Sequence, residues 1–221
     1  LEYEMHLLHN EYTGGLKLGA STTIAQYVLP PLLASFIGKF PQVSLSLLNG
    51  NSREIEAALQ EHRIDLGFVD GVFRLPNIRY TTFLEDELVA VVRTGCKLAV
   101  GEEITPDELF HLPLVLRERG SGTLDVFERA LQQHNIKLSS LQVLMYLGST
   151  ESIKLFLEHT DCMGIVSIRS ITRELYSGQL RVVEIKGMPM LRDFSFAQPQ
   201  GQESGLAQVF MQFAMHNNHK L

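Results

Sequence analysis

Five predicted strand-to-helix turns carry the glycine, hydroxyl and amide residues that bind small polar molecules. They read GASTT, NGNS, RGSGT, GSTES and VSIRS. Free N–H groups and a partial positive charge gather at the start of a helix, and ligands of open α/β sheets bind beyond the carboxyl ends of the strands. Because such turns recur in both halves of the chain, they predict a pocket for a small polar or anionic molecule where the halves face each other.

Helix capping is the alternative interpretation of each turn, because Ser, Thr and Asn are also the preferred residues at helix starts. Thr23 and Gln26 have the spacing of a capping box, and Asn51 with Glu54 has it as well. Arg117 and Arg119 flank the turn that contains GSGT and are candidate anion-binding side chains, with solvent exposure as the alternative.

The motifs typical of enzymes and metal sites are absent from the sequence. It contains no P-loop, no G-x-S-x-G elbow and no H-E-x-x-H pair. The carboxylates at 85–87 are expected to form a solvated turn rather than an acid–base pair. His6 with His9 and His216 with His219 have helical spacing but lack a third ligand nearby. The sequence therefore predicts a binding protein without catalysis, cofactor or metal.

Composition excludes several classes of protein. The 221 residues are 45% hydrophobic and 20% charged, with a net charge of −6 and scattered Lys and Arg, so this chain alone is not expected to bind nucleic acid. No apolar run approaches the roughly 20 residues that span a membrane. Cys96 and Cys162 lie far apart, which favours free thiols in a reducing cytoplasm over a redox pair.

The elements that position these turns alternate between apolar strands and amphipathic helices. This alternation predicts parallel sheets covered by helices on both faces. A short turn is expected before the main helix that starts near Pro31, since an interior proline breaks a helix. Residues 78–95 are expected to hold two strands with a bend near Glu85 and Asp86. Thr105 is expected to start a helix, with Glu108 three residues later at the spacing of a capping box, and the closing helix is expected over 204–216.

The alternation of strands and helices is interrupted near residues 94–97 and again near 188–193. Two breaks predict two α/β units joined by paired hinge strands, with the last strand and helix returning to the first unit. At the start, apolar residues recur at +4, +3 and +4 from Leu1 to Tyr12, which indicates a short helical seam. This seam belongs either to a helix that begins before this chain or to a short helix that packs on its own domain.

An ordered series of motifs carries a family likeness. The stretches L-P-P-L-L-x-x-F-x-x-x-F-P-x-V-x-L, G-N-S-x-E-I-x-x-x-L and I-D-L-G-F-V-D-G come first, and L-V-L-R-E-R-G-S-G-T, S-x-E-x-I-K and E-L-x-x-G-Q-L follow. From Gly15 to the C-terminal helix, the chain resembles the effector-binding domain of LysR-type transcriptional regulators.

This resemblance implies an α/β fold with two Rossmann-like subdomains and a central cleft, like that of type 2 periplasmic binding proteins. It places the end of a linker helix at 1–13, subdomain I at 14–93 plus 191–221, and subdomain II at 94–190. It also implies a homodimer, a tetramer in the full-length bacterial protein, and DNA contacts only through a winged helix-turn-helix domain that this chain lacks.

The resemblance implies a small-molecule effector in the cleft, with an anion among the candidates. The implied effector-binding residues are Ser21, Thr22, Thr23, Asn51, Ser52, Gly120, Ser121, Gly122, Thr123, Ser149 and Thr150. Leu124 stands where the family often has Arg, which weakens the case for a strongly anionic ligand. Two alternatives stay open: a type 2 solute-binding protein of a transporter, and more distantly a small enzyme on the same fold.

Overall fold

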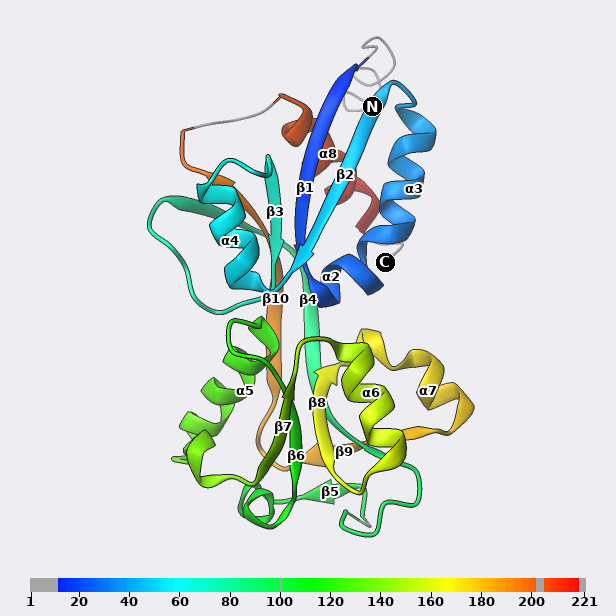
Figure 1. Ribbon diagram of the computed structural model, residues 1–221, viewed down its shortest axis with the longest axis vertical. Coiled ribbons are helices and arrows are strands. Elements are labelled where there is room, and N and C mark those ends of the chain that lie inside the picture. The colour runs from blue at the N-terminus through cyan, green and yellow to red at the C-terminus, as the bar shows by residue number, and fades with distance from the viewer. Residues whose placement is uncertain (1–11, 100, 202–204, 219–221) are drawn as a thin grey trace.

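The computed structural model, which describes residues 12–99, 101–201 and 205–218, has two lobes joined by two long strands (Figure 1). Lobe I contains β1 (Gly14–Ser21), α2 (Thr22–Tyr27), α3 (Leu29–Lys39), β2 (Val43–Gly50), α4 (Ser52–Gln60), β3 (Leu66–Val69) and α8 (Gly205–Asn217). Lobe II contains β5 (Glu103–Ile104), β6 (Leu114–Arg117), α5 (Gly122–Gln133), β7 (Val143–Leu147), α6 (Thr150–His159), β8 (Met163–Ser167), α7 (Thr172–Ser177) and β9 (Leu180–Ile185). Lobe II also contains the 3₁₀ helices η1 (Pro106–His111), η2 (Leu138–Ser140) and η3 (Ile168–Ser170). The strands β4 (Ile78–Arg93) and β10 (Met190–Pro199) run through both lobes.

The described strands form one mixed sheet in the order β2-β1-β3-β10-β4-β8-β6-β7, with β9 and β5 branching from β4. The parallel neighbours expected from the sequence are present in each lobe: β1 pairs with β2 and β3, and β6 pairs with β7 and β8. The two joining strands, β4 and β10, pair antiparallel with each other. The carboxyl ends of β1 and β2 and of β6 and β7 therefore lead into turns at the junction between the lobes (Figure 1).

The expected bend near Glu85 and Asp86 is wrong, because β4 is one continuous strand of 16 residues. Its pairing with β10 runs from Ile78 to Leu88 with one irregularity: Phe194 pairs with Leu84 and Ser195 with Thr82, so Phe83 is an extra residue in β4. A single extended strand thus passes from the core of lobe I to the core of lobe II.

The helix break at the two prolines is confirmed. The short helix α2 ends at Tyr27, and α3 begins at Leu29 with Pro30 and Pro31 in its first turn, where a missing N–H costs no helical hydrogen bond. The capping boxes at Asn51 and Thr105 are confirmed too, although Thr105 starts a 3₁₀ helix.

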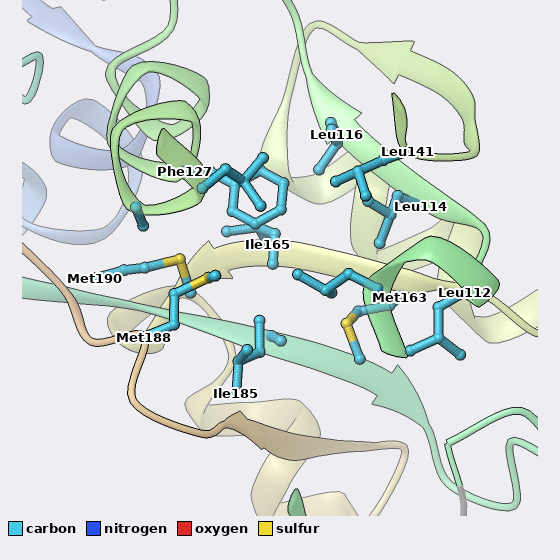
Figure 2. Packing of buried hydrophobic residues seen from close by; sticks show 14 of the residues in the cluster. Leu112, Leu114, Leu116, Phe127, Leu141, Met163, Ile165, Ile185, Met188 and Met190 are labelled. Carbon is cyan, nitrogen blue, oxygen red and sulfur yellow. The ribbon is translucent and has the colours of Figure 1, made fainter. Parts of the chain in front are cut away.

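Each lobe has its own apolar core. In lobe I, an aromatic cluster that includes Phe36, Phe68 and Phe196 packs between the sheet and α8. In lobe II, Figure 2 shows Phe127 of α5 packed against Ile165 of β8, with Met163, Met188 and Met190 beside them. The main cores of the two lobes are therefore separate from each other.

Some expectations concern residues outside the described ranges. They include most of the linker-helix segment 1–13, His6, His9, His219 and Ser204. Among the described helices, none is long and apolar enough to cross a membrane.

Candidate ligand-binding site between the lobes

Arg117, at the end of β6 in lobe II, connects two of the predicted turns across the junction. Its Nη2 donates to Thr22 Oγ1 at the start of α2, and its Nη1 donates to Thr150 Oγ1 at the start of α6, each at 3.5 Å. The Arg117 side chain is 2% exposed. A buried guanidinium between two helix starts is suited to hold an anion. By contrast, Arg119 is exposed and pairs with Glu128 at 2.8 Å.

Glu118 supplies the counter-charge of Arg117. The Nε and Nη2 atoms of Arg117 donate to the two carboxylate oxygens of Glu118 at 2.8 and 3.0 Å. From lobe I, Asn51 Nδ2 approaches the same carboxylate at 3.5 Å, and Arg53 donates its backbone N–H to Gly120 at 3.4 Å. Direct contacts therefore join the lobes here.

Ser21 and Thr23 flank Thr22, and their hydroxyl groups are buried without a hydrogen-bond partner. Thr23 is 1% exposed. The capping box predicted for Thr23 and Gln26 is wrong, because the helix begins at Thr22 and Ser21 occupies the N-cap position without capping it through its side chain. Buried hydroxyls without partners are unfavourable, which makes these two groups candidate ligand contacts.

A second group of predicted residues surrounds a buried ion network at the joining strands. Ser52 Oγ donates to Asp70 at 2.6 Å, and Thr123 Oγ1 accepts from Arg192 Nη1 at 3.1 Å. Gly122 packs so closely on Asp70 that an added Cβ would lie 2.5 Å from its backbone. The side chains of this group are therefore committed to the protein, and capping or packing explains them.

Arg192 of β10 is the centre of this network. It pairs with Asp70 at 2.9 Å and with Asp86 at 2.8 Å. The prediction that Asp86 lies in a solvated turn is wrong: Asp86 is buried and also accepts from Ser167 Oγ at 2.7 Å. Glu85 and Glu87, its neighbours on the strand, are exposed, because alternate residues of a strand face opposite sides.

Three other predicted residues have structural tasks. Ser121 caps α5 by accepting from Leu124 N, and Ser149 caps α6 by accepting from Ser152 N. Gly120 has a φ of +96°, and a Cβ there would lie 3.1 Å from Asn51. Glycine is therefore required at the point where lobe II approaches α4.

Tyr27 and Lys154 form a further contact across the junction that the sequence did not indicate. Tyr27 of α2 donates a hydrogen bond to Glu151 of α6, and burial followed by this bond raises the pKa of the Tyr27 phenol well above its usual range. Lys154 Nζ pairs with Glu151 and with Glu174, both at 2.8 Å, and lies 5.4 Å from the Tyr27 ring. This cluster joins α2 of lobe I to α6 of lobe II.

The two cysteines are free and buried, as expected. Burial raises the pKa of the Cys162 thiol to about 11, so little reactive thiolate forms there near neutral pH. Within the described ranges, no group of three or more His, Cys, Asp or Glu side chains could hold a metal ion.

The fold and this junction define a two-lobed α/β domain of the type 2 periplasmic-binding-protein kind. Residues 9–218 match the LysR substrate binding domain family, and the chain belongs to that family as an effector-binding domain. The comparisons favour a transcriptional regulator over a solute-binding protein of a transporter.

Two curated relatives illustrate this. The chain is 34% identical to the uncharacterized HTH-type transcriptional regulator YeiE of Escherichia coli K12 over 182 residues, which cover 82% of this chain and 61% of YeiE. It is 30% identical to the HTH-type transcriptional activator CmpR of Synechocystis over 201 residues, which cover 90% of this chain and 65% of CmpR. The chain thus spans less than two thirds of these relatives.

Two solved structures have the same fold. The regulatory domain of Synechocystis CcmR in complex with 2-PG has a TM-score of 0.83 and 28% identity, covering 92% of this chain and 97% of that one. The effector-binding domain of QuiR in complex with shikimate has a TM-score of 0.82 at 19% identity, covering 95% and 99%, which shows the fold alone.

Proposed function

We propose that this chain is the ligand-sensing part of a LysR-type transcriptional regulator and binds a small anionic molecule at the junction between the lobes. The observation that carries the proposal is the pair of buried, unpartnered hydroxyls of Ser21 and Thr23, on either side of Thr22, which accepts a hydrogen bond from Arg117. The 2-PG complex of CcmR supports a small-molecule ligand. Among the predicted contact residues, Ser21, Thr22, Thr23, Asn51 and Thr150 bind through side chains, while Ser52, Ser149, Gly120, Gly122 and Thr123 contribute backbone N–H groups. Ser121 holds the turn instead, because its own N–H donates to the Glu118 carbonyl oxygen.

The ligand acts by changing the balance between two relative positions of the lobes. It shifts that balance only as far as its affinities for the two positions differ. We assign the moving units to the segments expected from the sequence, 14–93 plus 191–221 and 94–190, with 1–13 as the end of a linker helix. Their motion is transmitted to a DNA-binding domain outside this chain. The site binds its ligand without catalysis, and the protein works in the cytoplasm.

We infer that a second copy of the chain covers the edge strand β7. Leu144, Met145 and Tyr146 are consecutive on this strand and 46, 47 and 43% exposed. The strand ends the sheet, and an exposed apolar edge strand favours pairing with another chain. A homodimer through this domain, and a tetramer of the full-length protein, fit this edge.

Replacing Thr23 with valine tests the site. The change removes one hydroxyl and keeps the shape, and the hydroxyl has no partner in the protein. The free energy of unfolding should therefore change little, whereas ligand affinity should fall about three- to tenfold, the value of one hydrogen bond. A thermal-shift screen that starts from 2-PG and small carboxylates selects the ligand, and calorimetry then measures its affinity.

Thr160→Val, at the far end of α6, is the matched control and should bind as the wild-type protein does. Equal affinities of Thr23→Val and Thr160→Val for the selected ligand would place the site elsewhere.

A further inference from the structure

The Arg117–Glu118 pair has the geometry of a bound carboxylate. Two donors of one guanidinium meet two oxygens of one carboxylate at 2.8 and 3.0 Å, which is the bidentate arrangement that Arg forms with carboxylate ligands. The carboxylate lies within reach of Asn51 Nδ2 of lobe I. Glu118 therefore occupies the place on Arg117 that an external anion would take.

Burial differs between the two partners. The Arg117 side chain is 2% exposed and receives only long contacts of 3.5 Å from Thr22 and Thr150, whereas the Glu118 side chain is 27% exposed. The Arg117 side chain would have to leave its buried position to move. Glu118 comes directly after the end of β6, and its partly exposed side chain can turn toward solvent. Of the two, Glu118 is the group that can be displaced.

We propose that Glu118 is an internal competitor for the anion site, and that it sets which anions bind. This inference rests on the proposed function of the junction. A simple anion that binds Arg117 must displace the Glu118 carboxylate, which binds Arg117 about as strongly. Such an anion therefore binds weakly. A ligand that also bonds to the unpartnered hydroxyls of Ser21 and Thr23 gains contacts that Glu118 does not make. The site therefore selects anions that carry a further hydroxyl or carbonyl oxygen, and rejects bare inorganic anions.

Glu118→Gln tests the competition, with inorganic sulfate as the probe. Glutamine keeps the size of the side chain and removes its charge, so the buried Arg117 loses its counter-ion. Sulfate can then take the place of that counter-ion. Calorimetry at constant ionic strength should show sulfate binding about tenfold tighter, or more, than to the wild-type protein, as expected for charge-assisted hydrogen bonds.

Glu128→Gln is the matched control, because it breaks the exposed Arg119–Glu128 pair and should leave sulfate affinity unchanged. Glu118→Asp keeps the charge but shortens the reach, and should bind sulfate more tightly than wild type even if Glu118→Gln folds poorly. Sulfate affinity of both Glu118 variants at or below the wild-type value would overturn the proposal. The Thr23→Val experiment uses the selected ligand and an intact Glu118, so its outcome does not depend on the sulfate experiment. Failure of the proposed function can therefore be distinguished from failure of this inference.

Discussion

At the scale of single residues, Glu56 of α4 is a buried carboxyl group whose hydrogen-bond partner is a phenol. Tyr80 Oη donates to Glu56 Oε1 at 2.6 Å, and Arg74 lies over the Tyr80 ring at 4.5 Å. Burial raises the pKa of Glu56 above its usual 4.5, although the Tyr80 hydrogen bond opposes this. The folded protein therefore holds the Glu56 proton to a higher pH than the unfolded chain does.

This raised pKa predicts how stability depends on pH. The contribution of protonated Glu56 is fully present below the unfolded-state pKa and is lost as pH rises through the folded-state pKa. Glu56→Gln keeps an acceptor for Tyr80 and cannot titrate. The free energy of unfolding of Glu56→Gln minus that of the wild-type protein should therefore increase from about pH 4 to about pH 7. Urea unfolding at both pH values measures this, with exposed Glu61→Gln as control; a difference that shrinks toward pH 7 contradicts it.

Asp86 shows what residue patterns can and cannot reveal. Three successive carboxylates resemble a solvated turn, yet the period-two burial of β4 turns the middle one inward. Its partner Arg192 is 106 residues away in sequence, so no local signal indicates the pair. Ser21 and Thr23 were predicted because hydroxyls at a helix start have a local signature, whereas Arg192, Asp70 and the Tyr27–Glu151 contact depend on long-range packing.

At the scale of elements, the helices were predictable to within a few residues because capping and proline signals are local. The start of α2 was misplaced because three successive hydroxyl residues can each cap, and the packing decides which one does. The continuity of β4 was not predictable, since it depends on pairing with β10 near the end of the chain. The capping boxes at Asn51 and Thr105, which involve neighbours in sequence, were predictable in full.

The two joining strands depend on the buried Arg192 network. Arg192→Met leaves Asp70 buried without its counter-ion and leaves Asp86 only the longer contact of 3.6 Å with Arg169, so the free energy of unfolding should fall by about 3–5 kcal/mol. Guanidinium chloride unfolding measures the loss. Arg63→Met, which breaks an exposed pair with Glu61, should change stability by less than about 1 kcal/mol. Similar losses in both variants would mean that the network contributes little to the hinge.

At the scale of the whole molecule, the edge strand β7 predicts self-association. Tyr146→Glu places a charge on this apolar edge and should shift the protein toward monomer, because burying an unpaired charge in an interface is costly. Sedimentation velocity over a range of concentrations measures the shift. Tyr176→Glu, on a side chain that is 96% exposed in α7, is the control. Unchanged association of Tyr146→Glu would remove β7 from the interface.

The antiparallel pairing of β4 and β10 also determines the order in which the lobes are completed during synthesis. Leu88 pairs with Met190, so the chain enters and leaves lobe II at adjacent points. When the last residue of β9 has been made, two parts of lobe I are still missing: strand β10, which pairs with β3, and the covering helix α8. On the ribosome, where domains fold as they emerge, lobe II is therefore expected to fold first, and the lobe that begins the chain is completed last.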